Sequence, residues 1–245
     1  MLTLSVVSHG QVQLVEALLD DLARLANPRL SEVLLTLNVP EREPRTPPGL
    51  RVKVLRNTAP RGFGANHNAA FRHVKTPLFA IVNPDIRLPD DPLPALIEAF
   101  NDAAVALVAP RIVNTQGHPE DAARLLITPW EIVLRRVRRQ AAPAYPAWLA
   151  GMFLVCRSET FRLVGGFDER YFMYCEDFDL SARVRLAGGH LRVCPRAVAV
   201  HAAQRASHRS LRHLRWHLTS LMRMWSSAAF WRYRALLASE PHPFT

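Results

Sequence analysis

The sequence predicts an α/β protein with a mostly parallel, Rossmann-like central sheet flanked by helices. Apolar strand patterns alternate with amphipathic helix patterns through the first third of the chain, which is the rhythm of a parallel sheet. The run 78–82 is apolar at consecutive positions, as expected for a strand covered on both faces. A chain of 245 residues, 49% of them hydrophobic, is also long and apolar enough for one buried core.

The first half of the chain divides cleanly into elements. A proline-rich loop at 39–48 separates the first three elements from the next, and a glycine-containing turn at 61–64 opens a helix that runs through Phe71. The run 78–82 stops at Asn83-Pro84-Asp85, which places Asp85 at the carboxyl end of a strand. In order, we expect a strand at 2–7, a helix at 12–26, and strands at 32–37, 52–55 and 78–82.

The second half is less regular. The segment 116–147 is polar, basic and punctuated by prolines, and we interpret it as an insertion or lid. Gly188-Gly189 ends a predicted helix at 176–187. Other expected elements are a helix at 93–104, a strand at 106–109, an apolar segment at 148–155, and a strand at 191–200 leading to His201. We therefore predict a main domain over 1–204 and a basic, amphipathic, helical tail over 205–245.

Composition narrows the class of protein. No apolar run approaches the roughly 20 residues of a membrane-spanning helix, and Met1 leads directly into a strand pattern without the features of a signal peptide. We expect a cytoplasmic protein, with peripheral binding to the inner face of the plasma membrane as an option. The three cysteines are far apart and predict neither a disulfide framework nor a zinc site: Cys156, Cys175 and Cys194.

The charge is strongly positive. Of the 31 basic residues only Lys53 and Lys75 are lysines, which leaves 29 arginines, and the formal net charge is +10. Such an excess attracts nucleic acid, acidic lipid headgroups and phosphorylated substrates alike, so charge alone does not select among these partners.

Polar side chains are expected to converge at one edge of the sheet. In open α/β sheets ligands bind beyond the carboxyl ends of the strands, where Ser8, His9, Asn38, Asp85 and His201 would meet. One carboxylate such as Asp85 can support Mg²⁺ or Mn²⁺ that bridges substrate phosphates. The structural alternatives to a metal site are that Asp85 is an aspartate in a turn after proline and that His201 is a polar residue at the end of a strand.

The acidic cluster Glu176-Asp177 starts a predicted helix directly after Tyr171-Phe172-Met173-Tyr174. Carboxylates in a first helical turn satisfy free backbone N–H groups and the helix dipole, which is the structural interpretation. Alternatively, the aromatic residues partly desolvate a carboxylate and raise its basicity, which suits a general base that deprotonates a hydroxyl. We choose Asp177 as that base, with Glu176 orienting it.

Together these residues resemble the family 2 glycosyltransferases with the GT-A fold. Each motif is short, but their order and spacing over roughly residues 2–207 are specific. Two features look most like the rhamnosyltransferase-type branch: the Asn-Pro-Asp form of the metal motif, and the Gly-Gly-Phe-Asp-Glu motif followed by Glu-Asp-Phe-Asp-Leu. The matching pieces are Ser5-Val6-Val7-Ser8, Arg61-Gly62-Phe63-Gly64-Ala65-Asn66-His67-Asn68, Asn83-Pro84-Asp85, Gly165-Gly166-Phe167-Asp168-Glu169, Glu176-Asp177-Phe178-Asp179-Leu180 with Arg183, and His201 before Ser207.

The resemblance implies an inverting transfer of a sugar from a nucleotide-diphosphate sugar to a hydroxyl of a glycan or lipid-linked acceptor. Asp177 would be the catalytic base, and Asp85 and His201 would hold Mg²⁺ or Mn²⁺, which neutralises the leaving diphosphate. The branch implies deoxythymidine-diphosphate rhamnose as donor and a cell-surface polysaccharide or glycolipid as acceptor. Nucleotide contacts are expected from Val7, Ser8, His9, Asn38, Gly62, Asn68, Asn83 and Asp85, and sugar or acceptor contacts from Trp148, Gly151 and Glu176.

Two departures from the family pattern leave alternatives open. Leu37 stands where the family commonly has an aspartate that binds the base, and Asn83 begins the metal motif in place of aspartate. A catalytically degenerate scaffold of the same fold is therefore one alternative. A sugar nucleotidyltransferase lacks support because no glycine-rich triphosphate loop is found, and no familiar nucleic-acid motif supports a nucleic-acid-binding module, so no nucleic-acid partner is expected.

The tail has a distinctive composition. Residues 205–234 contain seven arginines and no carboxylate, interleaved with large apolar residues. Such a helix either lies on an anionic membrane surface or caps the domain with its apolar face while its arginines stay solvated.

Overall fold

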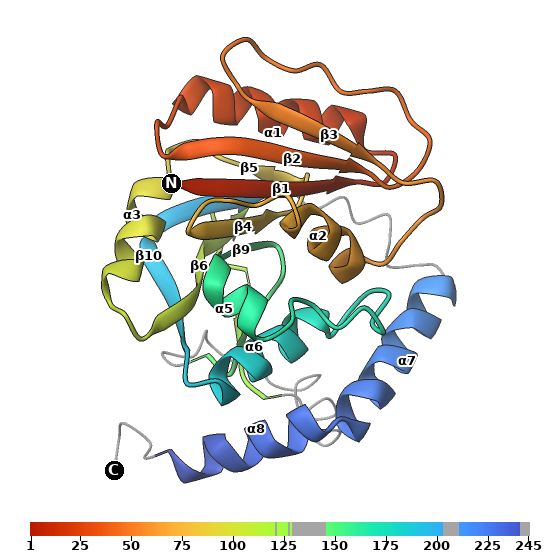
Figure 1. Cartoon of the computed structure of the whole chain (residues 1–245), viewed down its shortest axis with the longest axis vertical. Coiled ribbons are helices and arrows are strands. Elements are labelled where there is room, and N and C mark those ends of the chain that lie inside the picture. The colour runs from red at the N-terminus through yellow and green to blue at the C-terminus, as the bar shows by residue number, and fades with distance from the viewer. Residues whose placement is uncertain (121, 127, 129–145, 203–210, 241–245) are drawn as a thin grey trace.

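The computed structural model describes the chain except residues 121, 127, 129–145, 203–210 and 241–245 (Figure 1). Within the described residues, the strands form one large sheet in the order β3-β2-β1-β4-β9-β6-β10-β5 and a small second sheet of β7 and β8. The strands of the large sheet are β1 (Leu2–Ser8), β2 (Leu30–Leu37), β3 (Val52–Arg56), β4 (Leu78–Val82), β5 (Ile86–Arg87), β6 (Val105–Asn114), β9 (Phe153–Arg157) and β10 (His190–His201); the small sheet pairs β7 (Ala123–Arg124) with β8 (Trp148–Leu149).

The sheet is mostly parallel, as predicted. The pairs β1–β2, β2–β3, β1–β4 and β6–β10 are parallel, whereas β9 lies antiparallel between β4 and β6, and β5 is antiparallel to β10. The strand β4 is buried throughout, as its apolar run predicts, but it is parallel only to β1. Both parallel blocks point the same way, so β1, β2, β4, β6 and β10 all end at one edge.

The short link between β4 and β5 requires the sheet to curl. Val82 and Ile86 are four residues apart, a span of at most about 14 Å. Four strand spacings separate β4 from β5 in the sheet order, which would be about 19 Å in a flat sheet. Because the link is shorter than that distance, the sheet bends and brings the end of β4 toward the end of β10.

Helices cover both faces of the sheet. On one face α1 (Val12–Leu25) and α3 (Leu93–Glu98) bury Leu18, Leu22 and Leu96 against the strands. On the other face lie α2 (Phe63–Phe71), α5 (Ser158–Leu163) and α6 (Glu176–Leu186), around Phe79, Phe161 and Leu180. The helix predicted at 93–104 is shorter than expected. It ends at Glu98 and is followed by a 3₁₀ turn at Ala99–Asn101, because the chain has to turn into β6. The Asp102 carboxylate accepts from the Ala104 N–H in the link to that strand.

The tail forms two helices that pack outside α6. In Figure 1, α8 (Ala228–Ser239) runs along the lower edge of the molecule and α7 (Leu211–Ser226) rises along its lower right side. Phe230 and Tyr233 of α8 are buried against Phe178 of α6, and the Tyr233 hydroxyl donates to the carbonyl of Ala147 at 2.5 Å. One face of the tail therefore belongs to the hydrophobic core.

Among the described helices, none has the length and apolar character needed to cross a membrane. Most of the predicted insertion at 116–147 lies outside the described residues.

Candidate active site

The carboxyl ends of β1, β2 and β4 stand side by side. Ser8 pairs with Leu37, and Val6 pairs with Val82, so Asn38 and Asn83 each follow a strand next to β1. Val7 is half-buried in β1. The predicted convergence at one sheet edge is therefore present in the fold.

Asn38 anchors the loops at this edge. Its Oδ1 accepts from the Arg61 N–H and the Asn57 amide, each at 2.8 Å. Its Nδ2 donates to the Arg61 carbonyl at 2.9 Å and lies 3.1 Å from Nδ1 of His9. Asn38 is only 5% exposed, so in this structure its side chain orders the surrounding backbone.

Ser8 is held by a carboxylate that was not predicted as a site residue. The Ser8 hydroxyl donates to Glu41 Oε2 at 2.8 Å, and the Gly10 N–H donates to Glu41 Oε1 at 3.2 Å. Glu41 and Asn57 both come from loops or strand ends where no spacing marks them. Their contacts became visible only when β1, β2 and β3 were placed together.

The segment from Gly62 to Asn68 packs on the aromatic stretch that precedes α6. A Cβ on Gly62 would lie 2.7 Å from the Phe172 carbonyl oxygen, which also accepts from the Phe63 N–H at 2.9 Å. The Asn68 side chain brackets Phe167, with its Nδ2 donating to the Phe167 carbonyl and its Oδ1 accepting from the Phe167 N–H. Gly62 therefore lies against the stretch that precedes Glu176 and Asp177, and Asn68 holds Phe167 just before that stretch. Direct nucleotide contacts by Gly62 and Asn68 stay a prediction.

Asp85 and His201 meet as predicted from the ends of two strands. The Asp85 Oδ2 lies 3.2 Å from His201 Nε2, and Glu120 Oε2 lies 2.6 Å from His201 Nδ1. The hydrogen bond to Asp85, with support from Glu120, raises the pKa of His201 to about 9. Glu120 was not predicted, because it lies inside the polar segment 116–147 where no pattern distinguishes it.

The chemistry of this trio fits a divalent ion bound by two protein ligands. Asp85 Oδ1 is buried and has no hydrogen-bond partner, so it is an oxygen available to a cation. The Nε2 atom faces Asp85 while Nδ1 faces Glu120, an arrangement in which a carboxylate orients a metal-binding imidazole. The part of the chain that the structure describes holds no group of three or more side chains arranged to bind a metal. Mg²⁺ commonly keeps several waters and binds substrate phosphates beside one or two carboxylates.

Glu176 and Asp177 begin α6 in different environments. Asp177 is half-buried; its Oδ2 accepts from the Gly151 N–H at 2.9 Å and its Oδ1 from the Phe178 N–H at 2.8 Å. Glu176 is 6% exposed, and its Oε2 is buried without a partner. Burial raises the pKa of both carboxyl groups, and the charge of Asp177 raises the pKa of Glu176 further. Two N–H donors favour the carboxylate form of Asp177, whereas Glu176 is favoured in its neutral form.

The backbone before α6 is strained. Tyr174 and Cys175 have φ angles of 72° and 65°, in the left-handed region that residues with a side chain seldom occupy. Such conformations persist only where the surroundings enforce them. The position of Glu176 and Asp177 therefore depends on contacts that hold the stretch at 171–175.

One turn of chain links the Asn-Pro-Asp motif to Asp177. The Asn83 N–H donates to the Met152 carbonyl at 2.9 Å, and the neighbouring Gly151 donates its N–H to Asp177. The predicted Gly151 thus lies between the Asn-Pro-Asp motif and the start of α6, and its backbone N–H contacts Asp177.

Trp148 lies inside the protein. The indole is 4% exposed, packs against Phe178, and is covered by the Arg124 guanidinium at 4.9 Å, while its N–H donates to the Leu125 carbonyl. An acceptor contact by Trp148 stays a prediction, and this structure has no exposed face of the ring to support it.

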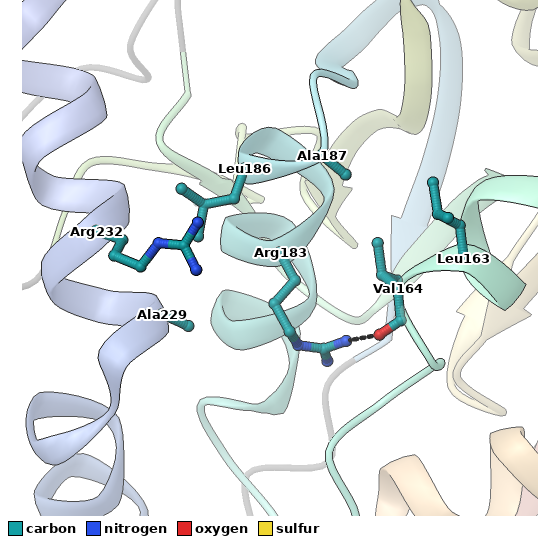
Figure 2. Close-up of a pocket in the computed structure, with 7 residues that line it drawn as sticks. All are labelled: Leu163, Val164, Arg183, Leu186, Ala187, Ala229 and Arg232. Carbon is teal, nitrogen blue, oxygen red and sulfur yellow. Dashed lines mark hydrogen bonds between the residues drawn. The ribbon is translucent and has the colours of Figure 1, made fainter.

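A separate cavity of about 340 Å³ lies on another side of α6 (Figure 2). Arg183 points into it and donates to the Val164 carbonyl at 2.5 Å while also pairing with Asp179. None of the predicted site residues lines this cavity, whose walls are Leu163, Val164, Arg183, Leu186, Ala187, Ala229 and Arg232.

Comparison with protein families and curated proteins gives a consistent result. Residues 3–219 match the family described as glycosyltransferase like family 2. The chain is 30% identical over 183 residues to the rhamnosyltransferase WbbL of Escherichia coli strain K12, covering 66% of this chain and 69% of WbbL. It is 28% identical over 189 residues to an N-acetylglucosaminyl-diphospho-decaprenol L-rhamnosyltransferase of Mycobacterium tuberculosis, covering 66% of this chain and 62% of that relative. The matches thus span about two thirds of each relative.

Solved structures share the fold. The mannosyltransferase PcManGT of Pyrobaculum calidifontis, in complex with GDP-Man and Mn²⁺, aligns with a TM-score of 0.64 and 19% identity over 99% of this chain and 76% of its own. Residues 1–349 of TarS from S. aureus, in complex with UDP-GlcNAc, align with a TM-score of 0.64 and 13% identity over 93% and 67%. These likenesses confirm the predicted GT-A type fold.

Proposed function

The chain belongs to the glycosyltransferase like family 2, and from this premise we propose that it transfers a sugar with inversion, in one displacement, from a nucleotide-diphosphate sugar. That the protein is a glycosyltransferase follows from its family and its curated relatives. Rhamnose is proposed as the sugar because both named relatives are rhamnosyltransferases. The proposed acceptor is a hydroxyl of a glycan or lipid-linked glycan, since the mycobacterial relative is named for a diphospho-decaprenol substrate.

The observation that carries the mechanism is the unequal environment of the two carboxyl groups at the start of α6. Asp177 accepts two backbone N–H groups, which favour its carboxylate form, while Glu176 is buried beside it without a partner for Oε2. In the proposed reaction, Asp177 accepts the proton of the acceptor hydroxyl as its oxygen bonds to the anomeric carbon. The bond from that carbon to the diphosphate breaks on the opposite face, and the electron pair leaves with the nucleotide.

Asp85 and His201 would hold Mg²⁺ or Mn²⁺, with Glu120 fixing the imidazole. When bound, the ion supplies positive charge that stabilises the leaving diphosphate. The buried, unpartnered Oδ1 of Asp85 supports this role. A nitrogen that binds a metal must be unprotonated, so an ion held by His201 would have to displace the proton that its raised pKa favours.

The nucleotide would lie over the ends of β1 and β2. His9 is exposed there, and Ser8 and Asn38 are already hydrogen-bonded within the protein. We therefore propose that Val7 and Ser8 contact the nucleotide through main-chain groups and that His9 and Asn83 contribute their side chains. Gly62 and Asn68 would act by holding the adjoining loop.

A calorimetric titration tests the donor site. We expect nucleoside diphosphates to bind wild-type protein much more tightly with Mn²⁺ than without it, and Asp85→Ala to lose that dependence. Asp90→Ala is the matched control, because Asp90 is exposed and also follows a proline. Comparison of thymidine, uridine and guanosine diphosphates would identify the base. Failure of every diphosphate to bind, with and without Mn²⁺, would overturn the proposal in favour of a degenerate scaffold.

A further inference from the structure

The helix α7 exposes a continuous apolar stripe. Leu214, Leu218 and Met222 follow one another at intervals of four residues, which places them on one side of a helix. They are 55%, 52% and 69% exposed, respectively. Exposed large apolar side chains that line up in this way mark an interaction surface rather than isolated surface residues.

The domain covers a different side of the same helix. Leu221 and Met224 are buried, at 7% and 0% exposure, in the cluster that contains Phe230 and Tyr233, and Ser220 beside them is 5% exposed. The apolar arc of α7 is thus wider than the contact with the domain requires. Packing on α8 and the cluster around it accounts for the buried part of the arc and leaves the stripe of Leu214, Leu218 and Met222 unexplained.

The charges beside the stripe are of one sign. Arg212, Arg215 and Arg223 lie on the exposed part of α7, and the sequence has no aspartate or glutamate between residues 203 and 239. Trp231 of α8, 52% exposed, is tied to the end of α7 because its indole N–H donates to the Trp225 carbonyl. Apolar side chains flanked by arginine and an indole match the boundary between acyl chains and anionic headgroups.

The same charges disfavour pairing of two copies through this face. A symmetric dimer would place the same patch on both subunits and bring arginines toward arginines. Like charges across an interface reduce affinity, whereas anionic lipid headgroups neutralise them. A lipid surface is therefore the occupant that the charge pattern favours.

The inner face of α7 holds the strained segment that precedes the candidate base. Trp216 stacks on Phe172 at a centroid distance of 4.7 Å, and the Ser220 hydroxyl donates to the Met173 carbonyl at 2.8 Å. The Tyr174 hydroxyl lies 2.8 Å from His213 Nδ1. The helix with the exposed stripe is thus also the helix that supports the left-handed conformation of Tyr174 and Cys175.

We propose that α7 lies on an anionic membrane surface, with Leu214, Leu218 and Met222 inserted among the lipids and its arginines at the headgroups. This placement puts the segment at 171–175, and with it Glu176 and Asp177, behind α7, ~10 Å (the diameter of a helix) from the bilayer. A lipid-linked acceptor would then reach Asp177 without leaving the membrane, a consequence that rests on the proposed function. The membrane contact itself does not depend on that function.

Vesicle co-sedimentation of the full chain tests the surface directly. Phosphatidylcholine vesicles are compared with vesicles that contain phosphatidylglycerol as about a third of their lipid. We expect binding to the anionic vesicles to exceed binding to the neutral ones by at least about tenfold. The triple variant Leu214→Gln, Leu218→Gln, Met222→Gln should lose at least about tenfold of that binding, because three half-exposed side chains no longer leave water.

Leu163→Gln is the matched control, since Leu163 is 74% exposed on α5, away from α7. It should bind vesicles like wild type. Urea denaturation shows whether the triple variant is folded like wild type, and nucleoside-diphosphate titration without vesicles tests the donor site separately. Wild-type protein that ignores anionic vesicles, or a triple variant that binds them equally, overturns the proposal. If wild type and Leu163→Gln are dimers in analytical ultracentrifugation and the triple variant is a monomer, the stripe belongs to an interface with a second copy instead.

Discussion

The two acidic parts of the candidate site are built in opposite ways. Asp85 belongs to a network of charged side chains, in which His201 lies between two carboxylates. Asp177 is held by backbone N–H groups beside Glu176, which is buried and lacks a partner. The first arrangement keeps charges available for a charged ligand, whereas the second adjusts proton affinity. Asp85 and Asp177 are chemically the same side chain, and the groups that surround each one determine its role.

The largest expected effect is on the proton-accepting side. Asp177→Asn keeps the shape of the side chain but removes the base, so kcat should fall by about 10² to 10⁴-fold. Metal-dependent donor binding, measured by calorimetry, should stay within about twofold of wild type. Because burial raises the pKa of Asp177, wild-type kcat should decrease as pH falls through a value above 3.8, where the carboxylate becomes protonated.

Two results would break this part of the comparison. Substantial activity in Asp177→Asn would move the base elsewhere, with Glu176 as the first candidate. Loss of donor binding in the same variant would mean that Asp177 belongs with the binding half of the site.

A smaller effect is expected from the carboxylate that orients His201. Glu120→Ala removes the 2.6 Å contact to Nδ1, and Mn²⁺ affinity should weaken by about 10 to 100-fold. Electron paramagnetic resonance of free Mn²⁺, in the presence of nucleoside diphosphate, measures the affinity without relying on turnover. Glu120→Gln keeps a hydrogen-bond acceptor and should recover most of it. Equal affinity in wild type and Glu120→Ala would reduce Glu120 to a surface residue.

The smallest expected effects are on stability, at two glycines that contact the start of α6 or the stretch before it. A Cβ on Gly62 would lie 2.7 Å from the Phe172 carbonyl oxygen, so Gly62→Ala should cost about 1–3 kcal/mol in the free energy of unfolding. A Cβ on Gly151 would meet Asp177 Cβ at an ordinary 3.5 Å and leaves the N–H in place. Gly151→Ala should therefore change stability by less than about 1 kcal/mol. Urea denaturation of both variants checks the contrast, which disappears if they are equally stable.

The tail caps the domain, which is one of the two interpretations that its sequence allowed, and it also leaves an apolar stripe exposed. Met224, Phe230 and Tyr233 cap the domain, while Leu214 and Met222 remain exposed. Periodicity alone could not divide the apolar arc between a protein contact and a second surface, because both need the same residue types at the same spacing.

Sequence alone determined most of the framework. The alternation of strand and helix patterns predicted the order and type of the elements, and hence the sheet edge at which Ser8, Asn38 and Asp85 meet. The acidic start of α6 was also readable, because local motifs depend on neighbours in the chain. The family and the GT-A type fold were predicted from the order and spacing of these motifs, and the comparisons confirm both.

Tertiary structure decided what each side chain does at that edge. The antiparallel placement of β9 and the curl of the sheet bring Asp85 to His201, and neither feature has a local signal. Glu41 and Glu120 come from irregular segments, so only their spatial neighbours mark them as part of the site. The physical reason is that hydrogen bonding and burial are set by groups far apart in sequence, whereas periodicity reports only which face of an element avoids water.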